Sequence, residues 1–103
     1  MARSTQSRSN FSSALKKARK SLGLSQEDFS YVSSRTYVST LERGLKSPTL
    51  NKVDDYSETL GIHPLTLLAL AYLTDTRPAS VSTLFDQVAK ELAQISDLQI
   101  DPG

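Results

Sequence analysis

The chain has 103 residues, of which 38% are hydrophobic and 22% are charged, a balance typical of one compact soluble domain. It has no cysteine and a single histidine, His63, so the sequence excludes disulfides, thiolate metal sites and a histidine metal cluster, and we expect no cofactor. No stretch approaches the roughly 20 apolar residues of a membrane span, and no apolar export signal follows the N-terminus, so we expect a cytoplasmic protein.

Basic and acidic residues are unevenly distributed along the chain. Residues 1–46 contain nine Lys and Arg against three Asp and Glu, whereas residues 47–103 contain three basic residues against eight acidic ones. A basic half attracts a polyanion such as DNA by neutralising phosphates, and an acidic half is repelled from the same surface. The two halves are therefore expected to face different partners, with solvated faces of unlike charge as the alternative interpretation.

The first helix is predicted from its capping residues and its apolar spacing. Residues 1–9 are rich in Ser and Arg and are predicted to be a disordered arm. Asn10 is an N-cap for a helix that runs to about Leu22, and Gly23 ends it. The predicted buried face contains Phe11, Leu15, Ala18 and Leu22.

A second helix is predicted after Ser25, because Ser25 and Asp28 stand at the N-cap and N3 positions of a capping box. Its inward residues are Phe29 and Val32. Ser33 and Ser34 then form a break, since both hydroxyls compete for backbone hydrogen bonds.

A third helix is predicted over about residues 35–43, with Gly44 closing it. Its inward residues are Val38 and Leu41.

Ser47 and Pro48 are predicted to be the N-cap and N1 residues of a fourth helix that ends before Gly61. Its buried stripe is predicted to contain Leu50, Val53, Tyr56 or Ser57, and Leu60. His63 and Pro64 open a fifth helix, LTLLALAYL, which is apolar on almost every side. Such a helix is either central to the core or partly buried by another chain.

The last predicted helix covers about residues 80–96, and its apolar residues follow one stripe. That stripe contains Val81, Leu84, Phe85, Val88, Leu92 and Ile95. We expect a dimer interface there, formed by Leu84, Phe85, Val88 and Leu92. In the alternative, this helix folds back and completes the monomer core.

Four segments of the chain resemble the Cro/CI-like, or XRE-like, helix-turn-helix transcription regulators of bacteria and their phages. They are LSQEDF, RTYVSTLERG, KSPTL and LGIHP, within about residues 11–72. The resemblance implies an all-α fold, a five-helix lambda-repressor-like DNA-binding domain with an additional C-terminal helix. The domain would span residues 10–74, with residues 75–103 forming the C-terminal helix and a short tail. Compared with the family, the connection at Ser33 and Ser34 is about two residues short.

Residue roles carried over from this resemblance divide into three groups. The first comprises DNA base contacts from Ser34, Arg35, Thr36 and Thr40. The second comprises phosphate contacts from Gln26, Tyr37, Arg43 and Lys46. The third is a partly buried salt bridge between Arg19 and Glu42 that orients the third helix. As alternatives, Tyr37 is half-buried against the first helix and Arg35 contacts only phosphate.

The resemblance implies a sequence-specific regulator, of the repressor kind, that inserts the helix at about residues 34–43 into the major groove of double-stranded DNA. It further implies a homodimer on a pseudo-palindromic operator, because one recognition helix contacts too few base pairs for selectivity. Such a protein would be nucleoid-associated and would not be an enzyme. The competing hypothesis is an antitoxin or protein-interaction regulator that binds a protein partner through the acidic C-terminal half.

Overall fold

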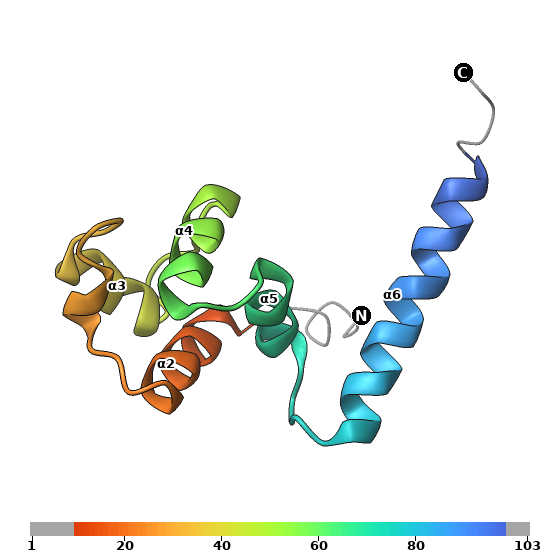
Figure 1. The fold of residues 1–103 in the computed structure, drawn as a ribbon, viewed down its shortest axis with the longest axis horizontal. Helices are drawn as coiled ribbons and strands as arrows, with labels where there is room; N and C mark the ends of the chain where they lie inside the picture. The colour runs from red at the N-terminus through yellow and green to blue at the C-terminus, as the bar shows by residue number, and fades with distance from the viewer. Residues whose placement is uncertain (1–9, 99–103) are drawn as a thin grey trace. The chain divides into compact units, whose positions relative to one another are not determined.

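The computed structural model describes residues 10–98, and within this range it contains helices and no strand (Figure 1). The elements in chain order are α2 (Phe11–Ser21), the 3-10 helix η1 (Gln26–Phe29), α3 (Arg35–Glu42), α4 (Leu50–Leu60), α5 (Pro64–Tyr72) and α6 (Pro78–Leu98). The expected all-α class is therefore correct. The arm expected at residues 1–9 lies outside the described residues. The chain divides into two units between Tyr72 and Leu73.

Among the residues that the structure describes, the buried hydrophobic core lies within the first unit, between Phe11 and Ala71. At its centre the rings of Phe29 and Tyr56 pack edge to face, with centroids 5.5 Å apart. The buried apolar residues are Phe11, Ala14, Leu15, Ala18, Phe29, Val38, Leu41, Val53, Tyr56, Leu60, Leu67 and Ala71. The two ends of the unit are joined, because the Asn10 amide donates to the Ala71 carbonyl at 2.7 Å. The helices of this unit therefore share one core.

The helix α2 lies where it was predicted. It begins after its cap Asn10, whose Oδ1 accepts from the Ser13 amide, and its C-cap Leu22 is followed by Gly23 with a φ of +73°. Leu22 itself, predicted to be buried, is 49% exposed. The helix α4 is capped by Thr49, whose hydroxyl accepts from the Lys52 amide, and not by Ser47 and Pro48. Leu50, predicted to be buried, is 74% exposed, because the first turn of α4 extends beyond the core.

The predicted second helix is reduced to the single 3-10 turn η1. Asp28 accepts from the Ser25 amide at 2.6 Å, and the predicted capping box of Ser25 and Asp28 is present. The chain then turns at residues 30–33, where the Val32 and Ser33 amides both donate to the Phe29 carbonyl. An α-helix to Val32 would leave too little chain to reach α3, and the tighter 3-10 turn accommodates the short connection.

His63 begins α5 as expected, since its Nδ1 accepts from the Leu65 amide at 2.9 Å. Leu67 and Ala71 face the core, while Leu65 and Tyr72 are exposed.

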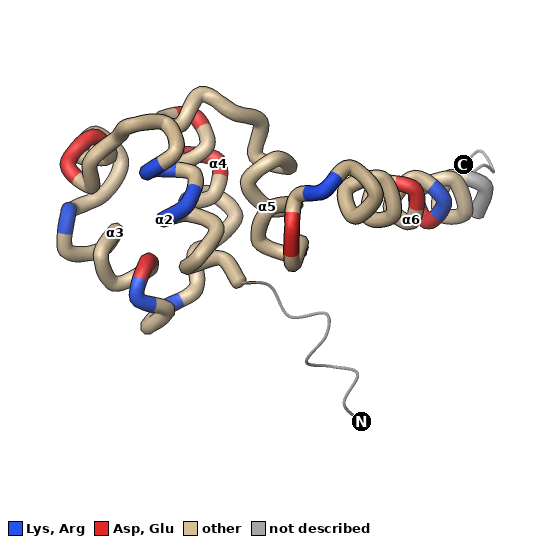
Figure 2. Tube along the Cα trace, turned by 90° about the horizontal axis from the view of Figure 1, so that it is seen from below, with Lys and Arg blue, Asp and Glu red and all other residues tan. Residues whose placement is uncertain are grey.

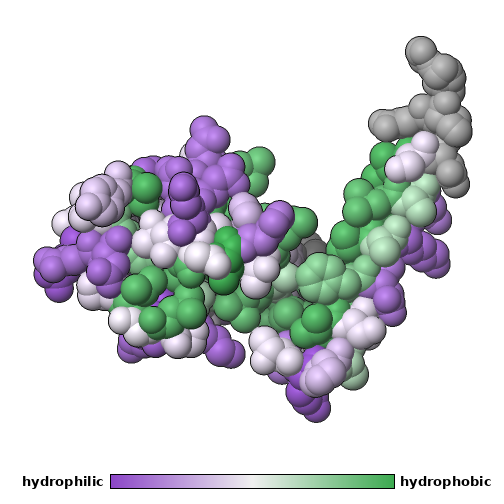
Figure 3. Space-filling view, viewed as in Figure 1, coloured by the Kyte–Doolittle hydropathy of each residue, from purple (hydrophilic) through white to green (hydrophobic). Residues whose placement is uncertain are grey.

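The second unit contains α6, and none of the described side chains of this helix is buried. An apolar band runs along the length of α6, with polar residues on another side (Figure 3). Its most exposed large members are Phe85, Val88, Leu92 and Ile95. None of the helices in residues 10–98 is long and apolar enough to cross a membrane.

Candidate nucleic-acid interface

The C-terminal end of α3 is joined to α2 by a buried ion pair. Arg19 donates from Nε to Glu42 Oε2 at 2.7 Å and from Nη2 to Oε1 at 2.9 Å. The side chains are 11% and 3% exposed respectively. The remaining guanidinium nitrogen, Nη1, donates to the Leu24 carbonyl at 3.0 Å. The salt bridge expected between Arg19 and Glu42 is thus present, and it joins the end of α3 to α2 at two points.

The protonation of this pair follows from its surroundings. Burial alone would raise the pKa of Glu42, but hydrogen bonds from Arg19 and Gln26, together with the Arg19 charge, outweigh it. The pKa of Glu42 therefore lies below its ordinary value. The hydrogen bond to Glu42 raises the pKa of Arg19. Both groups are therefore charged at neutral pH, and the pair persists there.

Gln26 is attached to the same pair. Its Nε2 donates to Glu42 Oε1 at 3.1 Å, and the side chain is half-buried. Gln26 was expected to contact a phosphate with help from the free amides of a helix terminus. Because η1 is one turn long and the Ser25 amide is bonded to Asp28, that help is small. The side-chain amide of Gln26 is held instead by Glu42, beside the C-terminal end of α3.

The short connection before α3 is held by α4. The Tyr56 hydroxyl, from the centre of the core, donates to Ser33 Oγ at 2.9 Å. Lys52 Nζ donates to the Val32 carbonyl. Burial raises the pKa of Tyr56, so its hydroxyl stays protonated and able to donate. Two side chains of α4 therefore set the start of α3 despite the missing residues of the turn.

The first turn of α3 carries three of the four residues expected to contact bases. Ser34 caps the helix, accepting from the Tyr37 amide at 3.0 Å through its Oγ. Arg35 and Thr36 follow it, and all three are exposed. The Arg35 guanidinium lies 3.6 Å from Glu27 in an ion pair whose side chains are 69% and 72% exposed. Such an exposed pair is weak and leaves Arg35 able to move to another acceptor.

Thr40 and Tyr37 are less accessible than the first turn. Thr40 is half-buried, and its hydroxyl donates to the Thr36 carbonyl at 2.9 Å, one turn earlier. Tyr37 is half-buried and packs against the core, in agreement with the alternative considered for it. On the opposite side of α3, Val38 and Leu41 are fully buried. The first turn and one side of α3 are therefore accessible to solvent, while the opposite side packs into the core.

Arg43 and Lys46 lie directly after α3, and both are exposed. The chain turns here at Gly44, whose φ of +76° favours glycine, and the Leu45 amide returns to the Thr40 carbonyl at 3.1 Å. Basic residues gather along α2, α3 and the loop that follows (Figure 2). The turn therefore places two cations beside the C-terminal end of α3.

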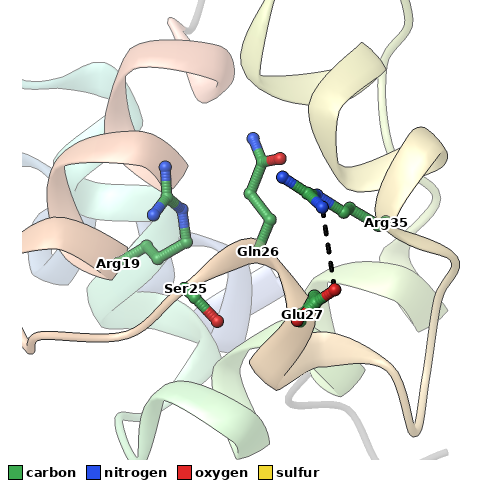
Figure 4. A pocket seen from close by; sticks show the side chains of 5 residues that line it. All are labelled: Arg19, Ser25, Gln26, Glu27 and Arg35. Carbon is green, nitrogen blue, oxygen red and sulfur yellow. Dashed lines mark ion pairs between the residues drawn. The ribbon is translucent and has the colours of Figure 1, made fainter.

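A small open pocket of about 300 Å³ lies between α2, η1 and α3. Its lining residues are Arg19, Ser25, Gln26, Glu27 and Arg35. Gln26 stands between the two arginines, and the pair of Glu27 with Arg35 closes one side (Figure 4). In the described part of the chain no group of His, Cys, Asp and Glu could hold a metal ion.

The sequence did not single out three contacts of this region. Glu27 pairs with Arg35 of α3, and Lys52 and Tyr56 contact the turn that precedes α3. Their contacts join residues distant in sequence, such as Tyr56 and Ser33, so no local pattern marks them. The shortness of the Ser33-Ser34 connection was the one available signal, since a short connection makes fewer hydrogen bonds of its own and relies on contacts from elsewhere in the fold.

A family model described as helix-turn-helix matches residues 15–67, slightly more than half of the chain. The chain therefore belongs to the Cro/CI-like, or XRE-type, helix-turn-helix family, whose members are DNA-binding transcription regulators. The matched residues contain all of α2, η1, α3 and α4 except the first turn of α2. No curated protein and no solved structure matches the chain.

Proposed function

We propose that the chain is a sequence-specific repressor that inserts α3 into the major groove of double-stranded DNA and acts as a dimer on a pseudo-palindromic operator. The observation that carries the proposal is the two-sided character of α3. Ser34, Arg35 and Thr36 are exposed on its first turn, whereas Val38 and Leu41 are buried. In helix-turn-helix proteins the start of the second helix contacts base edges.

In this proposal the first turn of α3 makes most of the base contacts. Arg35 would leave Glu27 and pair with guanine O6 and N7, at small cost because the existing ion pair is exposed. Thr36 offers a free hydroxyl and methyl group. Thr40 offers mainly its methyl group to a thymine, since its hydroxyl already donates within α3. Ser34 retains its hydroxyl hydrogen as a donor while its oxygen caps the helix.

Phosphate contacts fall to residues at the edges of α3. Arg43 and Lys46 supply charge from the loop after α3, and Gln26 supplies an amide positioned by Glu42. Tyr37 contributes its hydroxyl, while its ring packs on the core.

The dimer would form through four apolar residues of α6, of which Phe85, Val88 and Leu92 are exposed and Leu84 is half-buried. One recognition helix contacts only a few base pairs, and two helices spaced about 34 Å apart read adjacent major grooves. The exposed face of α5, with Leu65 and Tyr72, is a second apolar surface available for self-association.

The decisive experiment selects bound sequences from a random duplex pool and then measures affinity for the selected site by fluorescence anisotropy. Arg35→Ala is expected to weaken specific binding by about 1–3 kcal/mol and to relax the preference at one position of each half-site. Arg77→Ala is the matched control, because Arg77 is paired with Asp75 in the second unit. Equal losses in the two variants would contradict the proposed role of α3.

Salt dependence separates a DNA-binding regulator from a protein-interaction module. Four phosphate contacts from Arg43 and Lys46 of two chains predict a slope of log K against log salt near about −4, and Lys46→Gln should reduce it by about 2. Weak binding with no preferred sequence and a shallow slope would instead favour an antitoxin or interaction regulator acting through the acidic half.

A further inference from the structure

The apolar residues of α6 follow a heptad repeat along the whole helix. Val81, Phe85, Val88, Leu92 and Ile95 alternate at spacings of four and three residues. The helix runs for 21 residues with proline only at its first position and no glycine. We call these five residues the seam of α6. Four of them are exposed and Val81 is half-buried, so the seam has no partner within the second unit.

The residue types in this seam disfavour a parallel pair. Heptad spacing places Phe85 and Leu92 at a positions and the β-branched Val81, Val88 and Ile95 at d positions. Two-stranded parallel coiled coils favour the reverse arrangement, with β-branched residues at a and leucine at d. Leucine at a with isoleucine at d shifts the preference toward three or four strands.

The residues that flank the seam also favour more than two strands. The g positions hold Leu84, Glu91 and Leu98, and the e positions hold only small residues: Ser82, Ala89 and Ser96. In two-stranded coiled coils these positions carry charges that pair across the interface. Here the seam is extended by Leu84 and Ala89 into a broader apolar face, which suits contact with two neighbouring helices.

The size of the face supports more than one neighbour. A helix of 21 residues is about 31 Å long, and a face about 10 Å wide then covers roughly 300 Å² on each helix. A single helix pair buries less than the roughly 1,200 Å² of a standard protein interface, which makes it the weaker of the two assemblies. In a bundle of four, each helix contacts two others and the contact area per chain grows accordingly.

We propose that α6 assembles four copies of this chain into a four-helix bundle that joins two DNA-binding dimers. Four copies are preferred to three because two chains on a pseudo-palindrome are related by a two-fold axis, which a four-chain assembly retains. The inference rests on the proposed function only for this choice. A tetramer would hold two operators at once.

The test is sedimentation equilibrium of the full chain over a concentration series up to about 100 μM, because assembly depends on protomer concentration. The mass of four chains is expected at the upper end. A mass that stays at one, two or three chains would overturn the proposal. Lys90→Gln, at an f position away from the seam, is the control and should leave the mass unchanged.

A second variant exchanges the residue types at the a and d positions of the seam and keeps every one of them apolar. Phe85→Ile and Leu92→Ile combined with Val81→Leu, Val88→Leu and Ile95→Leu give the two-stranded pattern, so the mass should fall to two chains. Circular dichroism checks that this variant keeps its helix content. A variant that is folded and still contains four chains would show that the seam does not set the number of copies.

DNA bridging distinguishes this inference from the proposed function. An immobilised operator duplex with bound protein should capture a second, labelled duplex with the wild-type chain and not with the seam variant. A four-chain mass without DNA binding would overturn the proposed function alone. DNA binding with a two-chain mass would overturn the tetramer alone.

Discussion

At the scale of single residues, Glu42 joins the end of α3 to α2 and to η1. It receives Arg19 at two atoms and Gln26 at one, and its side chain is almost fully buried. A buried charge is tolerated only when it is paired and hydrogen-bonded. Glu42 therefore links the stability of the fold to the orientation of α3.

Removing Glu42 should be strongly destabilising. Glu42→Ala leaves the Arg19 guanidinium buried with one backbone acceptor, and the expected loss in the free energy of unfolding is about 3 kcal/mol. Thermal and urea unfolding measure it. The control is the double variant Arg19→Met with Glu42→Leu, which removes both charges and should recover most of the loss. An unchanged melting temperature in Glu42→Ala would contradict the role assigned to the pair.

The same residue predicts a dependence of stability on pH. Because the pKa of Glu42 is lower in the folded chain than in the unfolded chain, its contribution is complete above the unfolded pKa of about 4.3 and is lost as pH falls through the folded value. Stability should therefore decrease below about pH 5. Hydrogen bonds from Arg77 lower the pKa of Asp75 to about 2, which acts in the same direction.

Glu42→Gln isolates the contribution of Glu42 from that of Asp75. The difference in unfolding free energy between wild type and this variant should shrink as pH falls from 6 to 3, while the variant keeps the dependence due to Asp75. A constant difference over this range would show that Glu42 does not titrate with a lowered pKa.

At the scale of elements, the start of α3 depends on α4. The Ser33-Ser34 break was predicted from local chemistry, but the contacts of Tyr56 and Lys52 that hold it were not. Tyr56→Phe keeps the buried ring against Phe29 and removes only the hydroxyl. We expect a loss of about 1 kcal/mol in stability. We also expect weaker binding to the selected DNA site, because the first turn of α3 is no longer held.

Tyr31→Phe is the matched control for this prediction. Tyr31 lies in the same connection and is 96% exposed, so the loss of its hydroxyl should leave stability unchanged. Chemical denaturation and anisotropy on the same two variants supply the comparison. Equal stability of Tyr56→Phe and wild type would mean that the Tyr56 hydroxyl does not support the turn.

At the scale of the whole molecule, folding and self-association are expected to reside in different units. All core residues fall between Phe11 and Ala71, so a chain ending at residue 76 should still unfold cooperatively, with a melting temperature within a few degrees of the full chain. Size-exclusion chromatography with light scattering should show that it is monomeric. A shortened chain that remains associated would assign the interface to the exposed residues of α5.

The sequence by itself determined the all-α class, the family, most helix positions and the caps at Asn10 and Ser25. These depend on side chains three or four residues apart, which local spacing records. The tertiary structure decided the rest: the reduction of η1 to one turn, the exposure of Leu50, and the half-burial of Tyr37. It also showed that Tyr56 supports the turn. Each of these depends on where the core ends or on contacts between residues far apart in the chain, and local periodicity contains no information about either.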